Sequence, residues 1–69
     1  MRPNGQAMRA IRKARNVSLR ALEERTGLNR GYLSRLERGE IEEAAEHKVR
    51  QVATALDIPP DLLELKEKP

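Results

Sequence analysis

Two arginines on one short stretch are the side chains in this sequence best suited to grip another molecule. Arg30 and Arg35 lie between Asn29 and Leu36, where no acidic residue occurs. A guanidinium is a planar fork of donors that matches a guanine edge or a phosphate group. Gly31 would let a helix approach a surface closely. The stretch therefore indicates either a nucleic-acid-binding face or a basic helix face that is only solvated.

The residues around these arginines predict two short helices joined by a tight turn. Ser18 is a good N-cap, and Gly27 is suited to end a helix in the left-handed conformation. Leu33 and Leu36 have the spacing of a buried helix face, which leaves the arginines on exposed or flanking faces. We expect these helices over about residues 18–26 and 29–38. A helix on each side of a glycine turn is typical of a helix-turn-helix.

Three further amphipathic stretches predict that the whole fold is all-α. Asn16 suits the end of the first, and Pro60 suits the first turn of the last. We expect these helices over about residues 6–15, 43–56 and 60–66. Their helical spacing assigns buried stripes to Met8, Ile11, Ala14 and Val17, and to Ala45, Val49, Val52, Ala53 and Leu56. The prediction is a compact bundle of five short helices in one domain over residues 1–69, with its core in about 5–65.

The segments outside the helices carry weaker signals. Pro3 and Gly5 argue against a helix at the start, so Arg2 is expected on a frayed arm or on an arm that reaches DNA. In the connection over residues 40–43, Ile41 is expected to point inward. The acidic residues there suit the dipole at a helix start, so the fourth helix is expected to begin within this connection.

The charge distribution points to a polyanion as partner of the first half of the chain. Residues 1–39 hold ten Lys/Arg and three Asp/Glu, a net charge of +7, whereas residues 40–69 carry a net charge of −4. The basic residues do not oppose a broad apolar face, so a membrane is not the expected partner. One aromatic residue provides no stacking platform for RNA.

The composition argues against catalysis. There is no cysteine, and His47 is the only histidine, so we expect neither a metal site nor a catalytic triad. We place His47 on the surface. No nucleophile stands with a base, and no glycine loop could cradle a phosphate. We therefore expect a non-enzymatic, cytoplasmic protein without cofactors or a small-molecule substrate.

The central stretch resembles the Cro/C1-type helix-turn-helix domain of phage repressors, also called the XRE or lambda-repressor-like family. The matching residues are Ser18-Leu19-Arg20, Leu22, Gly27-Leu28 and the run from Tyr32 to Gly39. The resemblance extends more loosely over about residues 5–65. It implies a sequence-specific regulator of transcription, such as a repressor, that places its second motif helix in the major groove of double-stranded DNA.

Carried over by position, the resemblance implies roles for individual residues. It places base reading at Asn29, Arg30, Gly31, Ser34 and Arg35, and phosphate contacts at Ser18, Leu19, Arg20 and Arg38. It also implies a structural ion pair between Arg12 and Glu37. Lys48 is a further candidate for a phosphate. Tyr32 is open between two roles, because its ring can pack on the following loop or its hydroxyl can reach a phosphate.

Two residues depart from the family pattern. Several relatives have a glutamine where this chain has Leu19. Relatives prefer alanine at the position of Glu23, because the two motif helices cross closely there. We expect Glu23 to splay outward or to shift the helices slightly.

The last helix leaves the oligomeric state open. One short helix cannot bury all of its leucines on one face, so an outward residue could form a homodimer contact, as relatives often do, or close the monomer core. The candidates are Ile58, Leu62, Leu63 and Leu65. The alternative function is a protein-interaction module of the same fold, whose acidic half binds a partner such as a polymerase, a recombinase or a toxin.

Overall fold

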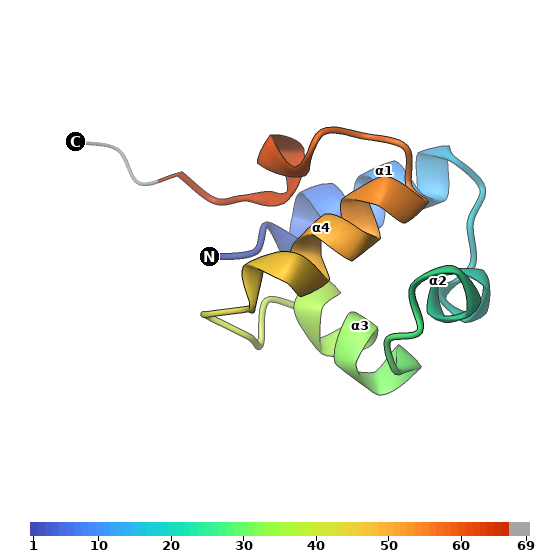
Figure 1. Cartoon of the computed structure of the whole chain (residues 1–69), viewed down its shortest axis with the longest axis horizontal. Coiled ribbons are helices and arrows are strands. Elements are labelled where there is room, and N and C mark those ends of the chain that lie inside the picture. Colours follow the sequence, from blue (N-terminus) through green and yellow to red (C-terminus); the bar gives the residue numbers. More distant parts are fainter. Residues whose placement is uncertain (67–69) are drawn as a thin grey trace.

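The computed structural model describes residues 1–66 of the chain. This part contains four α-helices and one short 3-10 helix, joined by loops (Figure 1). Their bounds are Gly5–Ala14 for α1, Leu19–Thr26 for α2, Arg30–Glu37 for α3, Glu46–Ala55 for α4 and Pro60–Leu63 for η1. The all-α prediction is confirmed. The expected fifth helix is shorter, because the chain becomes extended at Glu64, which forms an isolated antiparallel bridge with Pro3. No helix in the described part is long and apolar enough to cross a membrane.

The predicted helix ends are set by local chemistry. Side-chain oxygens of Asn4, Ser18 and Asn29 cap α1, α2 and α3, each accepting a hydrogen bond from an amide of the following turn. Gly27 ends α2 with a φ of 76°, and Asn16 follows α1 with a φ of 60°. These left-handed positions hold residue types that tolerate them.

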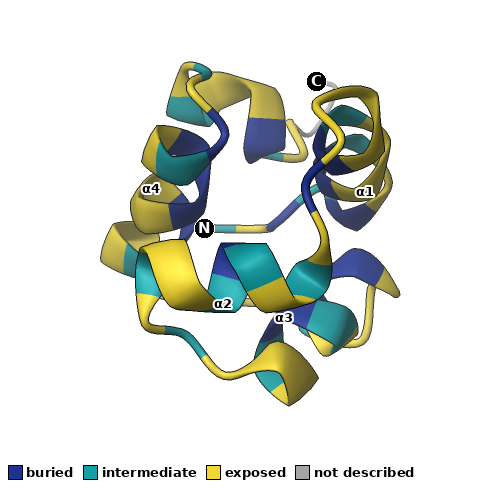
Figure 2. Cartoon of the chain, turned by 90° about the vertical axis from the view of Figure 1, so that its right-hand side faces the viewer, coloured by how far each residue is buried: buried dark blue, intermediate teal, exposed yellow. Residues whose placement is uncertain are grey.

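One aliphatic core joins all the helices (Figure 2). α2 packs against α3 and α4, while α1 packs against α3 and η1. The buried apolar residues are Met8, Val17, Leu22, Leu33, Leu36, Ala44, Val49, Val52, Ala53, Leu56 and Leu63. Ile11 and Ile41 are half-buried against this core. The arrangement holds α2 and α3 in a fixed relative position.

Two alanines that we assigned to buried stripes are exposed. Ala14 is the last residue of α1, and Val17 takes the inward position after the turn. Ala45 is the N-cap of α4, and Ala44 is buried in its place.

The expectation that α4 starts within residues 40–43 is also wrong. The helix begins at Glu46, and the residues before it form a loop. This loop is held by the start of the chain, because the Ala44 amide donates to the Met1 carbonyl oxygen at 2.9 Å. The Glu43 carboxylate lies 2.9 Å from the terminal amine of Met1. These tertiary contacts outweigh the helix-start signal of the acidic residues.

The first residues are not a frayed arm. The Asn4 amide donates to the Leu63 carbonyl oxygen, and the Leu65 amide donates to the Arg2 carbonyl oxygen, both at 2.8 Å. Residues 2–4 therefore run beside residues 63–65 and close one end of the molecule. Pro3 is buried in this arrangement.

Gly5, which we expected outside a helix, begins α1 at its closest approach to α3. A Cβ at this position would collide with the Leu36 carbonyl oxygen and lie 2.7 Å from that of Glu37. The absence of a side chain thus lets the start of α1 rest on the last turn of α3. This contact aligns α3 from its C-terminal end.

Leu63, one of the candidate dimer residues, belongs to the monomer core and is completely buried. Leu62 and Leu65 are 51% and 43% exposed, and Ile58 is half-buried. The 3-10 geometry explains the division, because only one leucine of the turn can face inward.

Candidate nucleic-acid interface

Helix α3 is anchored by its apolar face and presents the opposite face to solvent. Leu33 and Leu36 have no exposed surface. Arg30, Gly31 and Arg35 are all exposed on this short helix. The separation follows from helical spacing, since the leucines lie three residues apart and point the same way. α3 therefore offers a convex polar surface whose position is fixed by the core.

Among the predicted base-reading residues, Arg35 has the side chain that is freest to contact DNA. It is exposed in the last turn of α3 and makes no ion pair with residues 1–66. Its five donors are therefore available to a base edge or a phosphate.

Arg30, in contrast, is held by Glu23. One oxygen of the Glu23 carboxylate accepts the Arg30 backbone N–H at 3.1 Å, and the other lies 3.3 Å from Nε of the same arginine. Glu23 thus neither splays into solvent nor leaves the turn unfilled. It lies across the crossing of α2 and α3 and satisfies a free amide at the start of α3. Sequence reasoning missed this role, although the position of Glu23 at the helix crossing was the available signal.

The remaining predicted base-reading residues have more limited freedom. The Asn29 side-chain oxygen accepts the Gly31 N–H at 2.7 Å and is committed to capping. Gly31 is exposed, and a Cβ there would lie 2.9 Å from that same oxygen. Ser34 is half-buried. Among these residues, Gly31 would let the backbone of α3 approach DNA closely. The Asn29 cap fixes the geometry of the first turn of α3.

The start of α2 offers two backbone donors. The Ser18 hydroxyl oxygen accepts the Ala21 N–H, and the Ser18 carbonyl accepts the Leu22 N–H. The amides of Leu19 and Arg20 lie in the same turn and have no partner within residues 1–66. Free amides and the helix dipole together favour an anion.

The side chains at this end of α2 contribute unequally. The Arg20 side chain is exposed, whereas that of Leu19 is half-buried against the core. Leu19 can therefore contact a phosphate only through its backbone N–H. The Ser18 hydroxyl still has a proton to donate while its oxygen serves as the cap.

Tyr32 packs against α4 rather than standing free. The Lys48 Nζ lies 4.9 Å from the centre of the Tyr32 ring, which is the distance of a cation–π contact. Both residues are half-buried. Arg38 is exposed and pairs with Glu40, with 2.8 Å between Nε and the carboxylate. The pairing partly neutralises one predicted phosphate ligand.

The Arg12–Glu37 pair is present and is buried between α1 and α3. Arg12 Nε lies 2.6 Å and a terminal nitrogen 3.1 Å from the two Glu37 oxygens. The other terminal nitrogen donates to the Val17 carbonyl oxygen at 2.8 Å. The side chains are 10% and 3% exposed. This bidentate geometry ties the last turn of α3 to α1 and so restricts how α3 can tilt.

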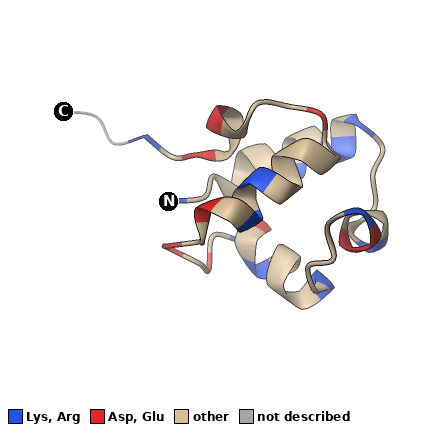
Figure 3. Cartoon of the chain, viewed as in Figure 1, with Lys and Arg blue, Asp and Glu red and all other residues tan. Residues whose placement is uncertain are grey.

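The charges follow the division seen in the sequence. Figure 3 shows acidic residues in the loop between α3 and α4 and along the segment that follows α4. The loop contributes the exposed side chains of Glu40, Glu42 and Glu43. The acidic loop follows α3, so it borders the candidate interface at the C-terminal end of that helix.

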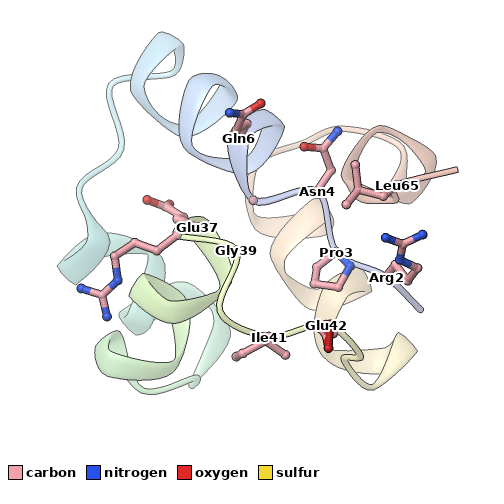
Figure 4. A pocket seen from close by; sticks show the side chains of 11 residues that line it. Arg2, Pro3, Asn4, Gln6, Glu37, Gly39, Ile41, Glu42 and Leu65 are labelled. Atoms are coloured by element: carbon pink, nitrogen blue, oxygen red, sulfur yellow. The ribbon is translucent and has the colours of Figure 1, made fainter. Parts of the chain in front are cut away.

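A hollow of about 430 Å³ lies where the start of the chain meets the loop after α3 (Figure 4). Its lining includes Pro3, Asn4, Ile41, Glu42 and Leu65. No group of three or more His, Asp or Glu side chains suited to a metal ion occurs in residues 1–66. His47 is exposed, as expected.

The chain is similar to known helix-turn-helix proteins in sequence and in structure. A helix-turn-helix family model matches residues 8–63. The restriction-modification controller protein C.AhdI from Aeromonas hydrophila has a similar structure, with a TM-score of 0.78 and 36% identity, covering 84% of this chain and 86% of that one. The clp gene regulator ClgR from C. glutamicum gives 0.76 and 37%, covering 84% and 75%.

A third similar structure is the master regulator for biofilm formation SinR in complex with DNA, with a TM-score of 0.78 and 30% identity, covering 83% of this chain and 90% of that one. The curated protein sequences contain no significant match. The family match begins within α1 and runs through α2, α3 and α4 to the end of η1. This chain belongs to the XRE-type helix-turn-helix family, whose members are DNA-binding regulators of transcription.

Proposed function

We propose that this protein regulates transcription by placing α3 in the major groove of a specific double-stranded DNA site. The observation that carries the proposal is the exposed face of α3, with Arg30, Gly31 and Arg35, on a helix that the core and the Arg12–Glu37 pair hold in place. An α-helix fits the major groove, where arginine can bind guanine O6 and N7 together. The similarity to SinR, solved in complex with DNA, supports this docking.

Phosphate contacts would orient the helix on the duplex. The free amides of Leu19 and Arg20 at the start of α2 suit one phosphate, with the Ser18 hydroxyl as a further donor. The Arg20 side chain is a charged partner for the same strand. Arg38 and Lys48 are further candidates, although each already contacts a neighbour, Arg38 the Glu40 carboxylate and Lys48 the Tyr32 ring. These phosphate contacts would fix the position of the protein along the duplex, whereas the side chains of α3 would supply the preference for a base sequence.

A second copy of the chain would complete the binding unit. Leu62 and Leu65 are exposed large apolar residues in the described part, and the half-buried Ile58 is a further candidate. Their burial in a homodimer would remove apolar area from water. Such a dimer would read two half-sites roughly 34 Å apart, one turn of the double helix.

The test begins with selection of a preferred sequence from a random duplex pool. Arg35→Ala is then compared with the unchanged protein on the selected site and on random DNA. Arg9→Ala, on an exposed residue of α1 outside the proposed interface, removes the same charge. We expect Arg35→Ala to weaken binding to the selected site by about 1–3 kcal/mol, with a smaller effect on random DNA.

Two results would contradict the proposal. An equal loss on both DNAs would remove Arg35 from base reading. Failure of the unchanged protein to bind random duplex at low salt would remove DNA binding altogether, because phosphate contacts produce strong non-specific binding under those conditions. The acidic loop between α3 and α4 would then become the surface to test for a protein partner.

A further inference from the structure

Glu23 is the residue whose observed role differs most from the family pattern. It lies on α2, seven positions before Arg30, and reaches across the turn to the start of the next helix. Both of its carboxylate oxygens contact Arg30, one at the backbone N–H at 3.1 Å and the other near Nε at 3.3 Å. The two side chains are 34% and 58% exposed, so the pair lies at the surface where DNA would dock.

This arrangement occupies the first two anion-binding groups at the start of α3. The first amide of the helix is satisfied by Glu23 and the second by the Asn29 side chain. A DNA phosphate that approached these two amides would meet the Glu23 carboxylate. The N-terminus of α2, in contrast, keeps two amides available.

The pair also restricts the Arg30 side chain. The shortest contact of the pair is through Nε, and the two terminal nitrogens of the guanidinium donate no hydrogen bond within residues 1–66. Those terminal nitrogens are donors that can bind guanine O6 and N7 together. An arginine without such a partner would sample many rotamers and could bind whichever phosphate lies nearest.

We propose that Glu23 is a specificity-determining positioning residue that restrains Arg30 from binding phosphates and directs its terminal nitrogens to a base. The inference rests on the proposed DNA-binding function and extends it. Glu23 acts on DNA through Arg30 and lowers sequence-independent affinity relative to affinity for the preferred site.

The experiment compares Glu23→Gln with Glu24→Gln on a random duplex over a salt series. Glutamine keeps an oxygen that can accept the Arg30 amide, so the fold is retained, and urea unfolding verifies this. Glu24 is exposed on the same helix and makes no ion pair in the described residues, so its variant has the same change in net charge. The Arg30→Ala variant and the Glu23→Gln/Arg30→Ala double variant complete the set.

We expect Glu23→Gln to bind random duplex about fivefold more tightly, the effect of removing one nearby charge in water. The slope of log affinity against log salt should steepen by about 0.9, because one more phosphate is neutralised. Glu24→Gln should have a clearly smaller effect on both quantities. The gain from Glu23→Gln should vanish when Arg30 is alanine. Selection with Glu23→Gln should lose base preference at one position of each half-site.

Three outcomes would overturn the inference. Equal effects of Glu23→Gln and Glu24→Gln would reduce the role of Glu23 to net charge. A gain that persists without Arg30 would show that the carboxylate acts on DNA directly. Weaker binding of Glu23→Gln to random duplex would mean that Glu23 helps Arg30 to hold a phosphate. If the unchanged protein itself binds no duplex at low salt, the proposed function fails, and that result is distinct from the other three.

Discussion

Loss of the Arg12 guanidinium should destabilise the protein more than loss of any surface charge. Arg12→Met leaves the Glu37 carboxylate, only 3% exposed, without its charged partner. It also leaves the Val17 carbonyl oxygen without the Arg12 donor. Methionine retains much of the apolar stem, so the change isolates the charged head from the packing of the side chain.

The expected cost is large relative to the total stability. Breaking a buried ion pair by removing one partner costs about 3–5 kcal/mol, because an uncompensated charge remains in the interior. Native domains are stable by roughly 0.05–0.15 kcal/mol per residue, which for this chain corresponds to about 3–10 kcal/mol. Arg12→Met should therefore unfold a large share of the molecules at room temperature.

Urea unfolding followed by circular dichroism measures the effect. With a slope of about 1 kcal/mol per molar urea for a small domain, the midpoint should fall by about 3–5 M. Arg50→Met is the matched control, because the Arg50–Glu46 pair on α4 is similar in length at 3.1 Å but 63% and 61% exposed. Its cost should stay below about 1 kcal/mol.

A double variant separates unpaired charge from lost packing. Arg12→Met combined with Glu37→Leu removes both charges, and most of the lost stability should return, since apolar replacement of a whole buried pair is often neutral. The reasoning would be refuted if Arg12→Met and Arg50→Met shift the midpoint equally. It would also be refuted if the double variant is less stable than Arg12→Met.

Variants at three further positions address backbone geometry and assembly. Gly5→Ala should lose about 1–3 kcal/mol through overpacking against the Leu36 carbonyl, and an unchanged melting temperature would contradict the close approach of α1 to α3. Gly27→Ala should lose about 1–2 kcal/mol through its left-handed φ alone, since a Cβ there meets nothing within 4 Å; Gly27→Asn should lose less in the same melt. Leu62→Lys should shift a dimer to monomer in sedimentation, and unchanged sedimentation of a dimer would place its interface elsewhere.

Local chemistry was sufficient to predict the secondary structure of the motif. Ser18 and Asn29 cap helices because their side chains reach amides of the next turn, and Gly27 ends one because its backbone tolerates the left-handed region. These interactions span only a few residues, so their outcome hardly depends on the rest of the molecule. The spacing of Leu33 and Leu36 likewise determines which face of α3 is exposed.

Contacts between distant segments decided what sequence patterns had left open or predicted wrongly. The start of α4 moved to Glu46 because Met1 holds the loop before it, a contact between opposite parts of the chain. The first residues are ordered by pairing with residues 63–65. Neither interaction leaves a periodic signal, because each depends on where two segments meet in space.

The candidate interface shows the same division. The amino-acid sequence by itself determined that the arginines of α3 lie on faces exposed beside or away from its buried leucines, since Leu33 and Leu36 have the spacing of one inward face. Only the tertiary structure decided that Arg35 makes no ion pair within residues 1–66, whereas Arg30 is paired with Glu23. Helix propensity and spacing act within one helix, whereas the state of an exposed charge depends on which neighbour the helix crossing brings within about 4 Å.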